Sequence, residues 1–298
     1  MIFIIKKLLL PLIFAFVAIA AVSGYAFYRY THKPKPVIKP LEEISIRFIE
    51  GWQNSDYASY LDKNQVVTKA DFNSSLATLD RSQYRFLGTV PKNSDLEGFL
   101  FPDTYRVLKD ATSKDIIKKL LDNFGKKLST TEFGVQDNYL ITGYQNLKST
   151  KTPGGMSLYE VVTLASILEK ETGTDLSKKG ADQTERLIPE RRTVAGIFLN
   201  RLTVGKALES DATINYITGK DKASPDLTDL EKNSPYNTYK YPGLPPGPIC
   251  NPSLMSIEAV LNPIKTDYFY FLHKQPSGEV VYSKTFEEHV NNKFKYLK

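Results

Sequence analysis

The segment from Ser157 to Gly173 is predicted to form a helix whose two ends are both specified by the sequence. Ser157 followed by Glu160 forms a capping box, in which the hydroxyl accepts one unpaired backbone N–H and the carboxylate accepts another. Gly173 supplies the left-handed residue that commonly ends a helix. Most positions between them are apolar, so we expect this helix to be buried on more than one side.

One carboxylate interrupts the apolar stripe of this helix. At about 100° per residue, Glu169 lies about 20° from Leu158 in the middle of the stripe, whereas Glu160 and Glu171 lie near the opposite, solvent-facing pole. Burying a carboxylate is costly unless the group is paired or has a chemical use. Burial would also raise its pKa toward a value suited to a proton donor. Periodicity alone therefore leaves two interpretations open, a buried ion pair with Arg or Lys and a catalytic acid.

Composition narrows the class of protein. The chain has 298 residues, of which 41% are hydrophobic and 24% charged, which is typical of a globular protein with one large or two medium domains. The net charge of +6 is modest, and no nucleic-acid-binding motif accompanies it, so we expect no nucleic-acid partner. A single cysteine, Cys250, and three scattered histidines give no zinc-binding spacing. We therefore expect neither a metal nor a cofactor.

A run of 21 residues without a charge, Leu8–Tyr28, lies near the N-terminus. At about 1.5 Å per residue such a helix is about 30 Å long, which is enough to cross a bilayer. Tyrosines gather at its end in the manner of an interfacial belt. A cleaved signal peptide with small residues near Ser23 is the competing interpretation. The length of the run favours an uncleaved membrane anchor over residues 1–31.

The charges that flank this run bear on its orientation. Two lysines precede the run and four basic residues follow it. Taken alone, the positive-inside rule therefore favours a C-terminal body in the cytoplasm. The residues before the run are Lys6 and Lys7, and those after it are Arg29, Lys33, Lys35 and Lys39.

Residues 32–43 are rich in Pro and Lys and predict a stiff, extended linker. The alternating pattern of residues 44–52 predicts a strand, and residues 54–61 predict a short helix. A second helix is expected after Thr68, a possible N-cap. This strand–helix–helix order over residues 44–90 has the size of a small binding module, although it could equally be the first layer of a single domain.

The rest of the chain, residues 91–298, mixes predicted helices and strands, so we predict an α+β domain. Residues 234–253 contain six prolines and predict a rigid, partly polyproline II wall that can lie beside a groove. The other expected elements are a strand at the end of residues 96–107, a helix over 113–124 capped by Ser113, a loop over 174–189, a helix over 190–202, a helix from Asn251-Pro252 to Leu261, and a hairpin over 267–285.

Four blocks follow one another behind the N-terminal apolar run: LEGFLFPDTYRV (96–107), ASILEKETG (165–173), VAGIFLNRL with LESDATINY (194–216), and SPYNTYKYPGLPPGPICNPS (234–253). In this order they resemble the endolytic murein transglycosylases, the YceG-like family. The resemblance covers roughly residues 44–292, which is most of the chain.

The resemblance implies a single-pass protein of the bacterial cytoplasmic membrane, with a LysM-like module over 44–90 and an extracytoplasmic α+β catalytic domain over 91–298. This orientation conflicts with the count of flanking basic residues. The family cleaves the MurNAc–GlcNAc β-1,4 bond inside peptidoglycan strands, leaves 1,6-anhydro-MurNAc ends, and is thought to terminate nascent strands beside cell-wall synthases. The chain would thus be a lyase, with Glu169, the first Glu of the EKET motif, as the family's catalytic glutamate.

In the expected reaction Glu169 donates a proton to the glycosidic oxygen and then accepts one from the sugar's own 6-hydroxyl, so no second carboxylate is needed. If Asp211 lay across the cleft, a two-carboxylate muramidase would be possible instead. A helix cap is the structural interpretation of Asp211. A non-catalytic, wall-anchored scaffold that binds glycan is a third possibility.

Several polar residues of the family's blocks are candidates for binding the N-acetyl groups or the developing charge. Packing and loop hydrogen bonds are the structural interpretation of each one. Arg201 is a candidate partner for a carboxylate of the Ser157–Gly173 helix. The substrate-binding candidates are Asn200, Asp211, Tyr236, Asn237 and Tyr239.

Overall fold

A computed structural model of the chain describes residues 2–32, 41–129, 155–173, 181–220 and 224–297. The chain divides into two compact units, Met1–Glu42 and Glu43–Lys298. The first unit contains the helix α1 (Ile2–Thr31), which includes the predicted membrane span. In the part of the chain that the structure describes, none of the helices combines the length and the apolar character that crossing a bilayer needs. The structure thus shows a helix at the position of the predicted span.

The second unit begins with a strand that pairs with a distant partner. β1 (Glu43–Arg47) runs antiparallel to β2 (Thr104–Leu108), and Ile46 lies opposite Tyr105. Because β2 lies beyond residue 90, residues 44–90 share their sheet with the following region, and a separate LysM-like module is not shown. The elements between the strands are α2 (Asn54–Lys63), α3 (Lys69–Ala77), which is capped by Thr68 as predicted, and the 3-10 turns η1 (Arg81–Gln83) and η2 (Arg85–Thr89).

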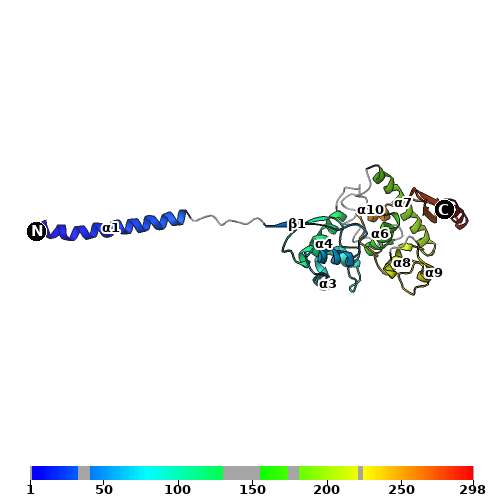
Figure 1. The fold of residues 1–298 in the computed structure, drawn as a ribbon, viewed down its shortest axis with the longest axis horizontal. Coiled ribbons are helices and arrows are strands. Elements are labelled where there is room, and N and C mark those ends of the chain that lie inside the picture. The colour runs from blue at the N-terminus through cyan, green and yellow to red at the C-terminus, as the bar shows by residue number, and fades with distance from the viewer. Residues whose placement is uncertain (1, 33–40, 130–154, 174–180, 221–223, 298) are drawn as a thin grey trace. The chain divides into compact units, whose positions relative to one another are not determined.

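The centre of the second unit is the helix α6 (Leu158–Thr172), which contacts α7 (Ala181–Thr203) and α10 (Leu254–Leu261) (Figure 1). The predicted capping box between Ser157 and Glu160 is present, and Gly173 ends the helix with a φ of 77°. Every residue from 161 to 169 is buried. The middle of this helix is therefore enclosed on all sides, which is more burial than one apolar stripe requires.

The remaining elements complete an α+β unit. β3 (Tyr270–His273) and β4 (Val280–Ser283) form the predicted antiparallel hairpin, and α11 (Phe286–Tyr296) follows it. In Figure 1, α3 and α4 lie at one side of this unit and the C-terminal segments at the other, with α6, α7 and α10 between them. The other helices are α4 (Ser113–Ser129), α8 (Asp211–Thr218) and the short α9 (Leu227–Leu230).

The predicted starts of three helices were wrong. α7 begins at Ala181 and contains Pro189, whereas a loop was expected to end at that proline. A proline removes one helical donor but does not always end a helix, and here its carbonyl still accepts a hydrogen bond from Thr193 Oγ1 at 2.8 Å. α4 is capped by the reciprocal pair Thr112 and Asp115 rather than by Ser113. α10 begins after Ser253, whose hydroxyl caps it, and not at Pro252.

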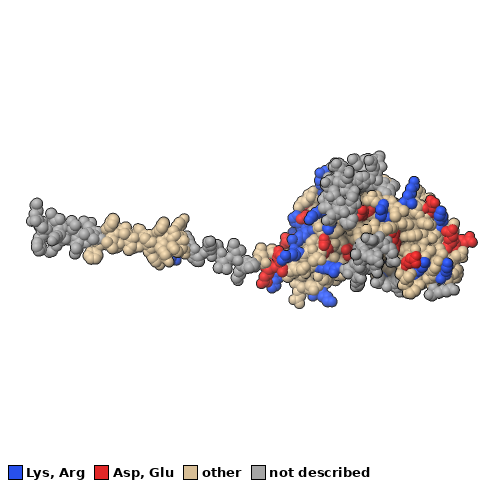
Figure 2. Space-filling view, turned by 90° about the horizontal axis from the view of Figure 1, so that it is seen from above, with Lys and Arg blue, Asp and Glu red and all other residues tan. Residues whose placement is uncertain are grey.

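Charged side chains of both signs are spread over the visible face of the second unit (Figure 2). Among the atoms that Figure 2 colours by charge, Lys and Arg side chains lie among Asp and Glu side chains.

Candidate active site

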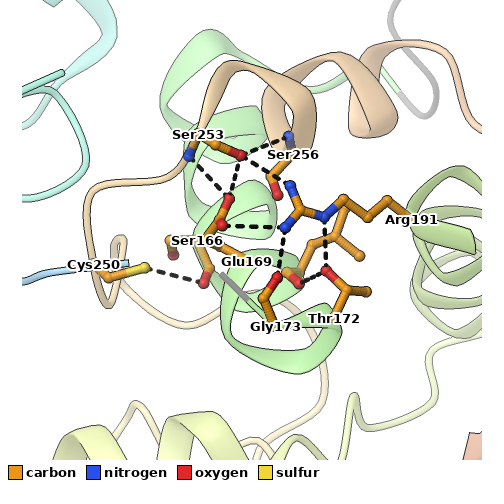
Figure 3. A network of polar contacts seen from close by, with 9 residues as sticks. Ser166, Glu169, Thr172, Gly173, Arg191, Cys250, Ser253 and Ser256 are labelled. Carbon is orange, nitrogen blue, oxygen red and sulfur yellow. Dashed lines mark hydrogen bonds and ion pairs between the residues drawn. The ribbon is translucent and has the colours of Figure 1, made fainter. Parts of the chain in front are cut away.

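Glu169, the predicted catalytic glutamate, is completely buried beneath α10 (Figure 3). Its Oε1 lies 3.3 Å from Nη2 of Arg191. Its Oε2 accepts hydrogen bonds from the backbone N–H of Ser253 at 2.9 Å and from the Ser253 hydroxyl at 2.5 Å. Both carboxylate oxygens are thus occupied by donors of the protein itself.

Arg191 is equally enclosed, and its guanidinium group is fully engaged. Nε donates to Thr172 Oγ1 at 3.0 Å, Nη1 to Ser253 Oγ at 3.0 Å, and Nη2 to the carbonyl of Gly173 at 2.7 Å. The pair therefore joins the C-terminal end of α6 to α7 and to the start of α10 (Figure 3). Of the two interpretations of Glu169, this geometry is that of the buried ion pair.

Glu171, two residues further along α6, is in a different environment. It remains partly exposed, and its Oε1 accepts a hydrogen bond from the hydroxyl of Ser210. Burial raises the pKa of Glu171, the Ser210 hydrogen bond lowers it, and the negative charge of Asp211 raises it again. The expectation that Glu171 faces solvent alone was wrong, because α8 packs against this side of α6.

Asp211 and Tyr239 are brought together beside Glu171. The Tyr239 hydroxyl donates to Oδ1 of Asp211. Burial raises the pKa of Asp211, whereas the Tyr239 hydrogen bond lowers it. Asp211 is the first residue of α8, and Ser210 occupies the N-cap position. The prediction that Asp211 caps this helix was therefore wrong, because the N-cap is the preceding residue, Ser210. The Asp211 carboxylate instead accepts a hydrogen bond from Tyr239.

The backbone explains why these residues meet. The N–H of Glu209 donates to the Thr238 carbonyl at 3.0 Å, and the N–H of Ser210 donates to Thr238 Oγ1 at 3.1 Å. Thr213 Oγ1 lies 2.8 Å from the same hydroxyl oxygen. The EKET, ESDAT and YNTY motifs, separated in the sequence, therefore converge at Glu171.

The two asparagines predicted to bind substrate use their amide groups within the protein. Asn237 is buried, its Nδ2 donates to the carbonyls of Leu230 and Lys232 at 2.8 Å, and its Oδ1 accepts the N–H of Tyr239 at 3.0 Å. It thereby shapes the loop that carries Tyr239. Asn200 donates to two carbonyls before β3, those of residues 266 and 268, at 2.8 and 3.0 Å.

Tyr236 lies in a second aromatic group, separate from the Asp211–Tyr239 pair. Its ring centroid is 4.9 Å from that of Tyr216, and both rings are partly buried. Burial raises the pKa of Tyr236 to about 12. Gly247 packs beneath this group so closely that an added Cβ would meet Tyr159 Oη at 2.3 Å and Tyr236 Oη at 3.2 Å.

Arg201 does not pair with the central helix as expected. It forms an ion pair with Glu209 at 2.8 Å and donates to the carbonyl of Phe269 at 2.7 Å. Glu209 has a φ of 50°, a left-handed conformation that costs a non-glycine residue energy unless its surroundings hold it. Arg201 thus supports the turn that leads into Ser210.

The sequence did not predict a cluster of buried hydrogen bonds around Asn251, which joins distant segments of the chain. Asn251 Oδ1 accepts the N–H groups of Gly98 and Leu100 at 3.0 Å, and its Nδ2 donates to Asn54 and to Glu97. Burial raises the pKa of Glu97 well above its usual value. An acidic residue inside the otherwise apolar LEGFLF block was the available signal.

Glu50 was also missed. It is partly buried on the turn after β1. Burial raises its pKa, a hydrogen bond from its own N–H lowers it, and the charge of Glu169 raises it. Within the described residues, no group of three His, Cys, Asp or Glu side chains is arranged to hold a metal ion.

Comparison with known proteins places the chain in a family. Residues 27–295 match the YceG-like family. The chain is 37% identical over 243 residues to an endolytic murein transglycosylase of Bacillus subtilis, covering 79% of this chain and 58% of the relative. It is 35% identical over 202 residues to the protein of the same description from Streptococcus pneumoniae, covering 66% of this chain and 31% of the relative.

A solved structure agrees with these matches. The crystal structure of a YceG-like protein from Listeria monocytogenes superposes with a TM-score of 0.64 and 30% identity, covering 84% of this chain and 76% of that one. The chain spans 58% of the length of the Bacillus relative and 31% of that of the Streptococcus relative. Because the family match extends over nearly the whole sequence, the chain belongs to the YceG-like family.

Proposed function

We propose that this protein is a lytic transglycosylase, a lyase that cleaves the MurNAc–GlcNAc β-1,4 bond inside peptidoglycan strands and leaves 1,6-anhydro-MurNAc ends. Membership of the YceG-like family and the description of the Bacillus and Streptococcus relatives as endolytic murein transglycosylases support it. The expected metabolic role is the termination of nascent strands beside cell-wall synthases.

We assign the proton transfer to Glu171, where the sequence predicted Glu169. The observation that carries this assignment is the contrast in access and pairing between the two side chains. Glu171 is partly exposed where three motifs of the family meet, whereas Glu169 is enclosed and paired with Arg191. A group that delivers a proton must reach the substrate oxygen. Glu171 can do so without breaking the core.

In the proposed reaction, the protonated Glu171 gives its proton to the glycosidic oxygen as the bond from C1 of MurNAc to that oxygen breaks. The GlcNAc portion leaves as an alcohol, and positive charge develops at C1. The 6-hydroxyl of the same MurNAc attacks C1 and loses its proton to the Glu171 carboxylate. The 1,6-anhydro ring closes, the carboxyl group is protonated again, and no water is consumed.

A second candidate is the two-carboxylate muramidase. The observation in its favour is that Asp211 lies beside Glu171 and that burial raises the pKa of both carboxyl groups. In that case one carboxylate would activate a water molecule, and the product would carry a reducing end. The two reactions therefore differ in the chemical nature of the new strand end.

The deciding experiment incubates the purified full chain with intact sacculi and identifies the released ends by mass spectrometry. Anhydro ends support the transglycosylase, and reducing ends support the muramidase. An absence of cleavage supports the non-catalytic, glycan-binding scaffold. Glu171→Gln and Glu169→Gln are compared with Glu231→Gln, which changes an exposed carboxylate on the surface. We expect Glu171→Gln to stay folded and make no product. Retained cleavage in Glu171→Gln, together with a folded but inactive Glu169→Gln, would return the role to Glu169.

We also propose that α1 anchors the protein in the bacterial cytoplasmic membrane, with Glu43–Lys298 outside the cytoplasm. The uncharged run Leu8–Tyr28 and the family resemblance support this proposal, and the peptidoglycan substrate requires it. The strand–helix–helix order of β1, α2 and α3 is consistent with a LysM-like glycan-binding module. Protease added to spheroplasts should degrade the second unit, and protection of that unit would place it in the cytoplasm.

A further inference from the structure

We propose that Asp211, oriented by Tyr239, is a positioning residue that controls the proton carried by Glu171. Because this role assumes that Glu171 transfers the proton, it rests on the proposed function. Asp211 itself would neither donate to the substrate nor activate water. Its contribution would be to fix which of two neighbouring carboxyl groups is protonated before the bond breaks.

The first step is the contact between α6 and the start of α8. Ser210 donates its hydroxyl hydrogen to Oε1 of Glu171, and the backbone N–H of Ala212 also donates to this carboxylate. Asp211 lies between these two donors in the sequence. Its backbone is therefore held against Glu171 on both sides, and its charge acts directly on that group.

The second step is the orientation of the Asp211 side chain. Tyr239 donates its hydroxyl hydrogen to Oδ1 of Asp211. Tyr239 is in turn positioned by the buried Asn237, whose Oδ1 accepts the Tyr239 N–H at 3.0 Å. Thr238 bonds to Ser210, directly before Asp211, and to Thr213, two residues after it. The orientation of the Asp211 carboxylate is thus fixed by the hydrogen bond that it accepts from Tyr239. The neighbouring Ser210 donates its own hydrogen bond to Glu171.

The third step is the set of charges around Glu171. Asp211 of α8 raises its pKa, and His273 of β3 lowers it. Nε2 of His273 also lies 3.6 Å from Oε1 of Glu190 of α7. Around the Asp211–Tyr239 pair, Lys293 of α11 lowers the pKa of Asp211, and Glu209 raises that of Tyr239. The negative charge of Asp211, acting on Glu171, favours the protonated form of the Glu171 carboxyl group.

These contacts divide the roles of the two carboxyl groups. The Tyr239 hydrogen bond favours the ionised form of Asp211, and the resulting negative charge disfavours ionisation of Glu171. The shared site then holds its proton on Glu171, which is the group that the reaction requires to be an acid. Loss of the Asp211 charge would let Glu171 release its proton at lower pH.

The test measures kcat/KM against pH for the full chain with Asp211→Asn, Asp211→Glu and the control Asp267→Asn. Asp267 is 84% exposed in its side chain, so the control removes one charge outside the site. For Asp211→Asn we expect the alkaline limb of the profile to move to lower pH. A displacement of about one pH unit would reduce the rate about tenfold on that limb and much less at acidic pH. Asp211→Glu should restore most of the wild-type profile, and Asp267→Asn should match it.

A uniform loss of activity at every pH, with the alkaline limb unmoved, would overturn the proposal, because a structural or substrate-contacting role gives that result. Cleavage by Glu171→Gln would instead overturn the assignment of the proton transfer to Glu171, on which this proposal rests. A readout independent of activity is the titration of the Glu171 carboxyl carbon by NMR. In Tyr239→Phe, a milder variant, Asp211 should titrate at higher pH and the Glu171 curve should change with it. An unchanged Glu171 curve would also overturn the proposal.

Discussion

Two glutamates on the same helix, Glu169 and Glu171, have opposite environments. They are about 200° apart around α6. Glu169 is enclosed with both oxygens bonded to Arg191 and Ser253, whereas Glu171 is partly exposed against the hydroxyl of Ser210. The comparison shows that a carboxylate on the apolar side of a helix need not be the reactive one.

The difference follows from how each charge is accommodated. The Glu169 pair is buried with every guanidinium nitrogen in use, so its loss would leave an uncompensated charge in the core. Glu171 interacts with a hydroxyl, a backbone N–H and a neighbouring carboxylate, which allows it to exchange a proton. We therefore infer that one side of α6 serves stability and the other serves chemistry.

The largest expected effect tests the chemical side. Glu171→Gln preserves the shape of the side chain but cannot give or take the proton, so the turnover rate should fall by about 10²–10⁴-fold. The melting temperature should remain close to that of the wild type. Release of muropeptides from sacculi and a thermal melt of the same preparation check both statements. A comparable fall in Glu231→Gln would show that the loss is not specific to the site.

The next effect tests the structural side. Arg191→Met leaves Glu169 buried without its cation, and we expect the free energy of unfolding to fall by about 3–5 kcal/mol. Urea denaturation followed by circular dichroism measures this loss. Replacing both partners, as in Arg191→Met with Glu169→Leu, should recover part of it. An unchanged stability in the single variant would remove the contrast between the two glutamates.

A smaller effect is expected at the hydroxyl that caps α10. Ser253 donates to Glu169 and accepts from Arg191, so Ser253→Ala leaves both with one partner fewer. We expect a loss of about 1–3 kcal/mol in the free energy of unfolding. Ser277→Ala, at an exposed position in the β3–β4 turn, is the matched control. Equal unfolding curves for the two variants would contradict the role of this hydroxyl.

The smallest effect concerns pH. Burial raises the folded-state pKa of Glu97, so the folded protein binds more protons than the unfolded chain between the two pKa values. This contribution to stability is fully present below the unfolded pKa of about 4 and is lost as pH rises through the higher folded value. We expect Glu97→Gln to flatten the decline of stability with rising pH, as measured by urea denaturation at several pH values. A parallel decline in both proteins would contradict this assignment.

Local signals predicted much of the fold. The capping box at Ser157, the stop at Gly173, the cap at Thr68 and the β3–β4 hairpin are each encoded within a few residues, and the structure confirms them. The start of α7 was missed because a proline such as Pro189 is typical of the boundary between a loop and a helix. Only the packing of the helix against its neighbours, including the backbone bond from Ile264 to Arg192 at 2.9 Å, outweighs that preference.

The site depends on contacts that no local pattern contains. Asp211 meets Tyr239 across 28 residues, and Asn251 meets Glu97 across 154. The resemblance to a family pointed to motifs that meet in the structure, yet it could not tell which side chains face each other. Asn200 and Asn237, predicted to bind substrate, use their amides to hold neighbouring loops, while Asp211 and Tyr239 lie beside Glu171.

For the helix from Ser157 to Gly173, the amino-acid sequence was enough to predict where the helix begins and ends and the angle at which each glutamate leaves it. That information is local, because capping and periodicity depend on residues within a few positions. Only the tertiary structure decided what lies at each angle. It put Arg191 against Glu169 and Ser210 against Glu171. Because the middle of the helix is buried all round, periodicity alone cannot assign each glutamate to a core side or a solvent side.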